Sequence, residues 1–219
     1  MTLLIIGNER SLHECKAKLG TAVNYQHLTR HDPGAQLPAI DVVIDFLLAD
    51  TPEAISFYRN QIFRAVFVNS VTKALHHLIP ANLANTTLFV GLNGMPTFIN
   101  RPVWEVALLK KEDEVKLAEV GKQLQIEFAL VQDQAGMVTA RVIAMIINEA
   151  YLTLEEGTAS REDIDKAMKL GTNYPYGPFE WAERIGLNYV CEILAAVQAR
   201  ETQARFPISA LLKQQAMQR

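Results

Sequence analysis

The sequence has few cysteines, little net charge and no long apolar run. Its 219 residues carry a formal net charge of −3, which gives no electrostatic footprint for nucleic acid or an anionic membrane. No apolar stretch approaches the roughly 20 residues of a membrane-spanning helix, and the opening MTLLIIGNERS lacks the basic segment of a signal peptide. Cys15 and Cys191 stand alone, which fits a reducing compartment better than a disulfide framework. We therefore expect a cytoplasmic protein that binds neither nucleic acid nor membranes.

Motifs for metals and phosphates are missing as well. His76 and His77 form the only histidine cluster, and adjacent positions on a helix point about 100° apart, so the two rings cannot hold one metal ion from one face. We expect one of them to be packed and the other solvated. The sequence contains no glycine-rich phosphate loop and no nucleophile elbow. It therefore predicts no metal site.

What the chain does contain is a change of pattern near Asp133. Apolar residues make up 49% of the sequence, enough to bury a core. Before Asp133, short apolar runs alternate with helical stretches, and this predicts a parallel sheet with crossover helices. The expected strands are residues 2–6, 39–48, 65–68, 88–90, 104–109 and 127–131, and helices are expected at 11–19, from Thr51 and Pro52, and at 111–124.

After Asp133 only helical patterns occur. A long helix is expected over residues 141–154, with Gly157 ending it. Ser160 is a suitable N-cap for the next helix, and Gly171 is expected to end that helix in a left-handed conformation. Pro178 should open a third helix, because proline suits a first helical position. The sequence thus predicts an α/β domain over residues 1–132 and an all-α domain over residues 133–219.

The strand that ends at Gly7 invites a test for a dinucleotide-binding turn. That turn needs glycines in the pattern G-x-G-x-x-G, which here would fall on Gly7, Glu9 and Leu12, so only the first is present. A carboxylate at position 9 would face a diphosphate. No second strand that ends in Asp or Glu is evident about 20 residues on, and Asp32 lies in a turn-like HDPG. We expect a degenerate turn with no bound nucleotide.

The segment from Asn148 to Leu187, NEAYLTLEEGTASREDIDKAMKLGTNYPYGPFEWAERIGL, closely resembles the C-terminal helical domain of the NAD-dependent L-3-hydroxyacyl-CoA dehydrogenases. The resemblance implies a fold of α/β plus all-α type, in which a reduced Rossmann-like parallel-sheet domain precedes that helical domain. The family has a longer segment between its first and third strands, which contributes to CoA binding. Only 33 residues separate Gly7 from Asp41 here, which is too few to contain that longer segment.

A second stretch, GLNGMPTFINRPVWE from Gly91 to Glu105, resembles the family's G-x-H-F-F-N-P segment and the glutamate that follows it. By this resemblance the catalytic histidine falls on Asn93, and the glutamate that orients it falls on Glu105. The catalytic serine falls on Thr72, or on Val71 if the alignment slips by one residue.

Two further positions come from the same resemblance. The stretch AIDVVIDF resembles the family strand whose glutamate lies near the cofactor, with Asp45 in that place, and the catalytic asparagine falls on Ala140. NAD is implied only by the resemblance, through Gly7 and Asp45, and we expect no cofactor to be bound.

Three functions remain open at this stage. An amide such as that of Asn93 cannot serve as the base that oxidation of an alcohol needs. The first function is therefore a 3-hydroxyacyl-CoA dehydrogenase-like protein of acyl-CoA metabolism that has lost catalysis and binds an acyl-CoA-like small molecule or a partner. The second is a divergent active oxidoreductase on 3-hydroxyacyl-CoA or a related hydroxy acid using NAD. The third is a structural or assembly subunit.

The resemblance also implies a homodimer through the helical domain. The helical half carries a broad apolar face that a short domain covers poorly, and a two-fold contact is the commonest solution for soluble oligomers. That face comprises Ile143, Ile146, Ile147 and Ala150.

Overall fold

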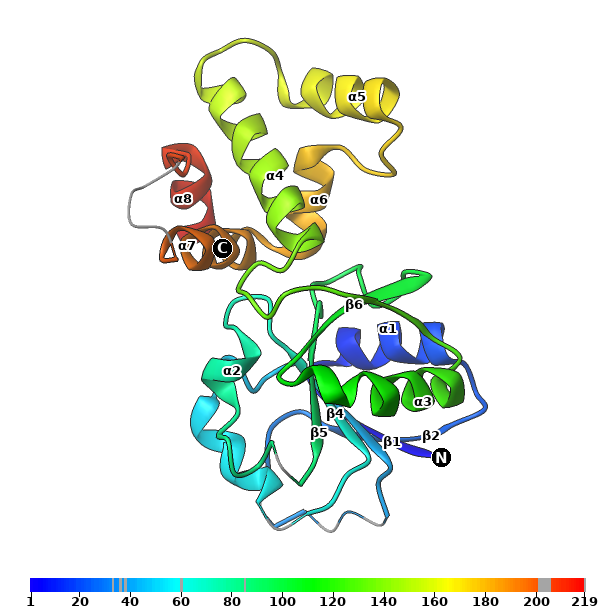
Figure 1. Cartoon of the computed structure of the whole chain (residues 1–219). Coiled ribbons are helices and arrows are strands. Elements are labelled where there is room, and N and C mark those ends of the chain that lie inside the picture. The colour runs from blue at the N-terminus through cyan, green and yellow to red at the C-terminus, as the bar shows by residue number, and fades with distance from the viewer. Residues whose placement is uncertain are drawn as a thin grey trace. The chain divides into compact units, whose positions relative to one another are not determined.

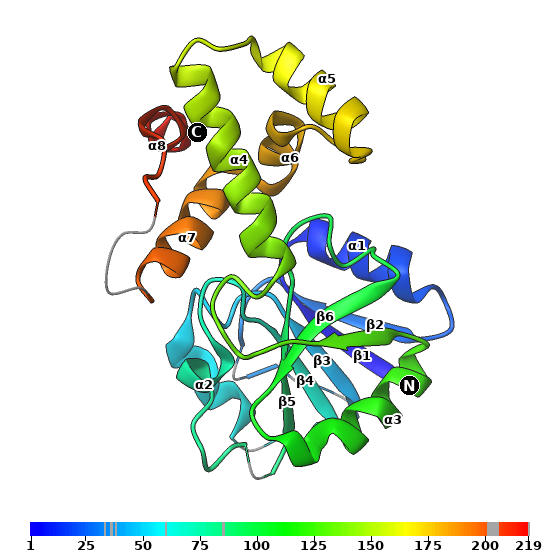
Figure 2. The same ribbon diagram turned by 45° about the horizontal axis from the view of Figure 1, so that its top comes forward.

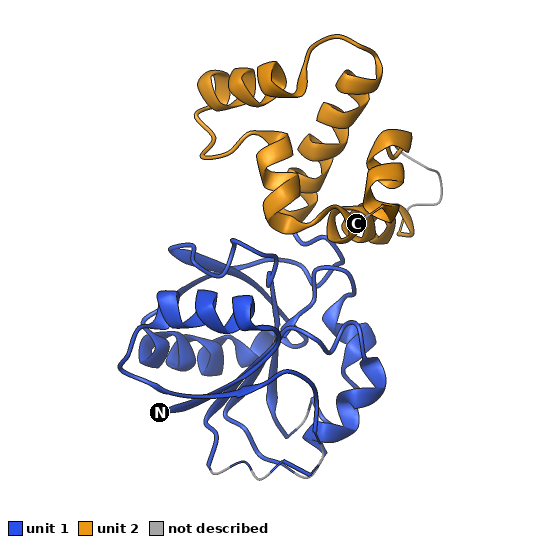
Figure 3. Ribbon diagram, turned by 180° about the vertical axis from the view of Figure 1, so that it is seen from behind, with its two compact units in different colours: residues 1–137 blue, residues 138–219 orange. Residues whose placement is uncertain are grey.

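A computed structural model of the chain describes residues 1–32, 34–35, 37, 39–59, 61–84, 86–200 and 206–218. The chain divides into two compact units, Met1–Met137 and Val138–Arg219, which Figure 3 distinguishes by colour. Among the described residues, no helix combines the length and the apolar character that crossing a bilayer requires.

Unit 1 is built on a seven-stranded sheet in the order β2-β1-β3-β4-β5-β6-β7. Neighbouring strands run parallel except for β5 and β6, which are antiparallel. Only a loop links β5 to β6, and a strand that returns without a crossover helix has to run back antiparallel. The strands are β1 (Thr2–Ile6), β2 (Asn24–Leu28), β3 (Val42–Asp45), β4 (Ala65–Asn69), β5 (Leu88–Leu92), β6 (Val103–Leu108) and β7 (Glu127–Leu130).

Helices cover both faces of this sheet (Figure 1). The helices of unit 1 are α1 (Glu9–Leu19), the 3-10 helix η1 (Pro52–Tyr58), α2 (Leu75–Leu78), the 3-10 helix η2 (Lys111–Asp113) and α3 (Glu114–Leu124). On one face Leu3 and Ile5 of β1 join the core under α1 and α3. On the other face Leu4 and Ile6 join the core with η1 and α2. The strands at the centre are apolar on both sides because both faces are buried.

Unit 2 is all helical and is arranged around α4 (Figures 1 and 2). Its helices are α4 (Thr139–Glu155), α5 (Arg161–Thr172), α6 (Pro178–Ile185), α7 (Leu187–Gln198) and α8 (Ala210–Met217). Helix α4 packs against α6, α7 and α8. The Ser160 hydroxyl accepts a hydrogen bond from the backbone N–H of Asp163 at 3.2 Å, as its N-cap position predicts.

Several details of the sequence prediction were wrong. Strand β2 was missed because its residues, NYQHL, are largely polar, as a half-buried edge strand permits. The strand expected over residues 39–48 is confined to Val42–Asp45. Helix α5 continues through Gly171, and it is Asn173 that adopts the left-handed conformation, with φ of 54°. Thr51 precedes a 3-10 helix and makes no side-chain cap hydrogen bond.

The apolar face proposed for dimerisation is mostly covered within the single chain. Ile143, Ile147 and Ala150 are all buried. The large apolar side chains of unit 2 that remain exposed are Val138, Val142, Leu170 and Met217. Ile146, the fourth residue of that face, is half-buried, and the pairing of two copies through unit 2 stays a prediction.

Candidate functional site

The carboxyl ends of β4 and β5 form a tightly packed junction. The amide oxygen of Asn69, the last residue of β4, accepts a hydrogen bond from the backbone N–H of Gly94 at 3.2 Å. A Cβ at position 94 would lie only 2.9 Å from the Asn69 side chain, so glycine is required for this approach. Asn69 and Ser70 are both buried. The junction therefore holds the residues that follow β5 in a fixed place.

Asn93 and Glu105 meet in this junction. The Asn93 side-chain N–H donates to the Glu105 carboxylate at 3.3 Å, and the backbone N–H of Asn93 donates to the Glu105 carbonyl at 3.0 Å. The Asn93 amide oxygen accepts from the backbone N–H of Met95 at 3.3 Å. Asn93 is 4% exposed. A buried amide is thus oriented by a carboxylate, and the pair offers hydrogen-bond donors and acceptors but no imidazole.

Thr72 lies beyond the end of the neighbouring strand β4 and is half-buried. The residue before it, Val71, is buried, and its carbonyl accepts a hydrogen bond from the backbone N–H of Gly136 at 2.6 Å. In unit 2, Ala140 is fully buried near the start of α4. A methyl group at this position has no hydrogen bond to offer a ligand.

The turn after β1 lies at the point where the strand order reverses, between β1 and β3, which is where doubly wound sheets bind ligands. A Cβ at Gly7 would lie 3.0 Å from Ser11 Cβ and 3.1 Å from the Phe46 ring. His27 Nε2 lies 2.8 Å from the Gly7 carbonyl oxygen. These three side chains crowd the Gly7 backbone from two sides.

The amino terminus of α1 is also capped from within the chain. The Asn8 side chain accepts hydrogen bonds from the Ser11 backbone N–H at 2.9 Å and from the Ser11 hydroxyl at 3.1 Å. Glu9, in the first helical turn, lies 3.6 Å from the ring of His27 and is largely exposed. A helix terminus that carries its own acceptor and a carboxylate is a poor site for a phosphate.

Asp45, at the end of β3, is fully buried and accepts hydrogen bonds from several sides. Its carboxylate accepts from the backbone N–H of Leu47 at 2.8 Å and of Leu48 at 3.1 Å. The Tyr58 hydroxyl donates to it at 2.6 Å, and His31 Nε2 lies 2.7 Å away. Burial, and next the charge and hydrogen bond of Asp45, raise the pKa of Tyr58 well above its usual value.

Sequence reasoning missed His31 and Tyr58. Both lie in segments with irregular or 3-10 structure, far from Asp45 along the chain. The one available signal was Asp45 itself, because a carboxylate in an apolar strand needs buried partners. The structure thus brings Gly7 and Asp45 to adjacent strand ends, and Asn93 and Glu105 to another junction of the same sheet.

Among the described residues, no group of three or more His, Cys, Asp or Glu side chains could hold a metal ion. His76 and His77 are both exposed, so the expectation that one is packed was wrong. Asp133 instead accepts hydrogen bonds from the backbone N–H groups of Leu75 and His76 at 2.6 and 2.8 Å and caps α2.

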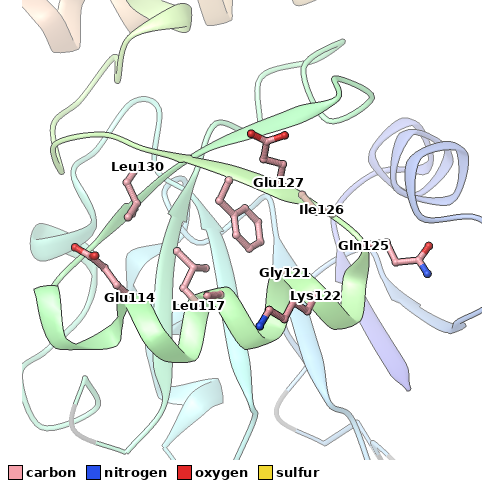
Figure 4. A pocket seen from close by; sticks show the side chains of 10 residues that line it. Glu114, Leu117, Gly121, Lys122, Gln125, Ile126, Glu127 and Leu130 are labelled. Carbon is pink, nitrogen blue, oxygen red and sulfur yellow. The ribbon is translucent and has the colours of Figure 1, made fainter.

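Two open grooves lie elsewhere on unit 1. One, of about 550 Å³, runs between α3 and β7 (Figure 4). The other, of about 410 Å³, lies near Met1, Asp41 and Arg64. Neither of these two grooves is lined by Asn93 or Glu105.

Residues 136–218 match the sequence pattern of the family described as 3-hydroxyacyl-CoA dehydrogenase, C-terminal domain. Over 87 residues the chain is 42% identical to 3-hydroxyadipyl-CoA dehydrogenase of Escherichia coli strain K12. This match covers 40% of this chain and 18% of that protein. The chain spans about a fifth to a quarter of the length of such sequence relatives.

Solved structures extend the likeness over both units. FadB2 of M. tuberculosis superimposes with a TM-score of 0.74 at 16% identity, covering 99% of this chain and 93% of that one. The (S)-3-hydroxybutyryl-CoA dehydrogenase PaaH1 of Ralstonia eutropha gives a TM-score of 0.68 at 20% identity, with the same coverage. At these identities the comparison shows a shared fold, a Rossmann-type unit followed by a helical unit.

Proposed function

Since this chain is a 3-hydroxyacyl-CoA dehydrogenase-like protein, with that family's C-terminal domain at residues 136–218, we propose that it has lost NAD-dependent dehydrogenation and acts by binding. Its ligand is an acyl-CoA-like small molecule, or its role is regulatory through a protein partner. The single observation that carries this proposal is the Asn93 amide, held by Glu105 where the resemblance places a histidine.

The chemical reason is proton transfer. Oxidation of a secondary alcohol by hydride transfer needs a base for the hydroxyl proton, and histidine serves because its pKa lies near working pH. The Asn93 amide has no such pKa, and general acid–base catalysis typically contributes about 10²–10⁴-fold. Ala140 also lacks the hydrogen-bond donor that would stabilise negative charge on a thioester oxygen. Glu105 remains, and the side chain that it holds at position 93 is an amide.

The turn after β1 supports the same proposal, because its residues do not fit NAD. Ser11 and Phe46 pack close to Gly7, and Asn8 already caps α1. Glu9 would add like-charge repulsion. Asp45, at the position assigned to cofactor binding, is engaged in four contacts inside the chain. We therefore derive no catalytic step through NAD.

The test is a fluorescence titration of NADH into the protein, with and without acetoacetyl-CoA, followed by calorimetry with acetoacetyl-CoA alone. The proposal predicts no saturable NADH signal in the low micromolar range in either titration, and heat of binding from acetoacetyl-CoA alone. A low-micromolar NADH dissociation constant that a Gly7→Ala variant abolishes would favour an active oxidoreductase. Absence of both signals would favour a structural subunit.

A further inference from the structure

The outer edge of β7 is open. This strand is the last in the sheet, and no further described strand pairs with it. Its Leu130 side chain is 47% exposed, and Phe128 is half-buried. An open edge that carries exposed apolar side chains is a template for another strand.

Helix α3 runs beside this edge and forms the other wall of the 550 Å³ groove. Glu114, Ala118 and Lys122 follow one another at i, i+4 and i+8, so they lie on the same side of α3, toward the groove. All three are exposed, and all three line the groove. Figure 4 shows Glu114 and Lys122 toward opposite ends of the helix. This side of α3 therefore carries an acidic side chain at one end, a small side chain in the middle and a basic side chain at the other end.

We infer that a second copy of this chain docks along the β7 edge, related to the first by a two-fold axis. A two-fold axis through Ala118 sets α3 antiparallel to α3 of the second copy. Glu114 of each copy then meets Lys122 of the other, and the small Ala118 side chains let the two helices approach closely. This surface is complementary to itself, as a symmetric contact requires.

Strand β7 is complementary to itself in the same way. Ile126, Phe128 and Leu130 all line the groove and so share one face of the sheet. Antiparallel pairing with Phe128 opposite its own counterpart sets Ile126 opposite Leu130 and Glu127 opposite Ala129. Apolar side chains then face apolar ones, and no like charges lie directly opposite, which is the stabilising arrangement for cross-strand pairs.

The symmetry centre proposed for α3, at Ala118, and the one proposed for β7, at Phe128, lie at about the same distance from the turn that joins the two elements. A tight turn at Gln125 joins α3 to β7. At about 1.5 Å per helical residue, Ala118 lies roughly 10 Å back from that turn. At about 3.3 Å per strand residue, Phe128 lies roughly 7–10 Å forward from it. One axis therefore passes through the middle of both elements. The paired strands would lie about 4.8 Å apart and the helices about 8–10 Å apart, as in continuous sheets and packed helices.

The test is sedimentation equilibrium of the full chain, from about micromolar to a few hundred micromolar, so that weak self-association becomes populated by mass action. Glu114→Lys places two positive charges together at each end of the interface, so the mass at the highest concentration should fall by about half. The double variant Glu114→Lys with Lys122→Glu restores the complementary pairs and should recover the original mass. Glu119→Lys makes the same charge change outside the groove and should leave the mass unchanged.

A second variant tests the centre of the interface. Ala118→Arg places a bulky charge on the axis at an exposed position, so folding is unaffected and the mass should again fall by about half. The comparison holds whether or not unit 2 forms its own dimer, because that contact would be present in every variant. The inference is overturned if Glu114→Lys and Ala118→Arg both keep the mass of Glu119→Lys, or if the double variant fails to recover it.

Discussion

The side-chain amide of Asn93 donates a hydrogen bond to the carboxylate of Glu105, with 3.3 Å between nitrogen and oxygen. The two residues come from the end of β5 and from the antiparallel strand β6, whose register brings them together. The Glu105 carboxylate, which could orient a catalytic base, therefore holds an amide that cannot accept a proton.

Removing the Glu105 carboxylate should destabilise the fold. In Glu105→Ala the buried Asn93 N–H loses this acceptor, and the loss of a buried hydrogen-bond partner costs about 1–3 kcal/mol. Glu105→Gln keeps an acceptor oxygen and should cost less than half as much. Urea unfolding of the three proteins measures the difference. Equal midpoints for Glu105→Ala and the original chain would show that this hydrogen bond contributes nothing.

Asp45 should matter more for stability than any other carboxylate of unit 1. Asp45→Ala leaves the Tyr58 hydroxyl and two backbone N–H groups without their acceptor in a buried site. Loss of one partner from a buried charged network costs about 3–5 kcal/mol. Asp50→Ala removes a nearby exposed carboxylate and serves as the control, with an expected change under about 0.5 kcal/mol. Similar unfolding midpoints for the two variants would contradict this assignment.

Alkaline pH should unfold the protein partly through Tyr58. Its pKa is raised from the usual value of 10.0 in the folded state, first by burial and then by Asp45. Above pH 10 the unfolded chain releases this proton while the folded chain retains it, so stability is full below that pH and falls as pH rises. The slope reaches about 1.4 kcal/mol per pH unit for one such group.

The matching variant is Tyr58→Phe, which removes the ionisable hydroxyl and keeps the ring. The free energy of unfolding is measured between about pH 9 and pH 11 in both proteins. The variant should start lower, because it lacks the hydrogen bond to Asp45, and should then lose stability less steeply. Parallel curves would show that Tyr58 titrates alike in the folded and unfolded chains.

Asn148 should fix the segment that leads into α8. Its amide oxygen accepts from the Ser209 backbone N–H at 2.9 Å, and its N–H donates to the Pro207 carbonyl at 2.8 Å. Asn148→Ala should lower the free energy of unfolding by about 2 kcal/mol, since both backbone groups lose their partner. Glu149→Ala, at the exposed neighbouring position of α4, is the control. Calorimetric midpoints that match between the two variants would contradict this role.

Unit 2 should pair two copies, as the family resemblance implies. The exposed apolar residues Val138, at the N-cap of α4, and Val142, in its first turn, are candidates for the contact. Light scattering of the Ala118→Arg variant, which lacks the α3 contact, should give about twice the chain mass. Adding Val142→Glu should reduce this to the chain mass, whereas adding Ala167→Glu on exposed α5 should not. If the Ala118→Arg variant itself is a monomer at high micromolar concentration, the pairing through unit 2 is refuted.

The sequence predicted the layout of the sheet better than its edges. Runs such as AVFVN and LFVGL are apolar on both faces, so β4 and β5 could be recognised from the pattern alone. Strand β2 could not, because a half-buried edge strand tolerates Asn, Gln and His. The helix α5 shows a similar limit: both Gly171 and Asn173 suit a left-handed conformation, and packing rather than propensity decides which residue adopts it.

For the candidate site, the sequence predicted which residues belong to it but not how their side chains contact one another. The family resemblance over Gly91 to Glu105 implied Asn93 and Glu105, and the structure adds that they share a hydrogen bond. Neither His31 nor Tyr58 could be assigned to Asp45, because contacts between residues far apart in the sequence leave no local pattern. The packing of Phe46 close to Gly7 was equally hidden, although the missing glycines predicted a defective turn.

The most direct test of the central claim is turnover of acetoacetyl-CoA with NADH, followed as loss of NADH absorbance under saturating substrate. We expect a rate no higher than that of buffer without protein, and the same result for Asn93→Ala, because Asn93 transfers no proton. A rate on the order of 10 s⁻¹, near the median for enzymes, which Asn93→Ala or Glu105→Gln abolishes, would contradict it and establish an active dehydrogenase.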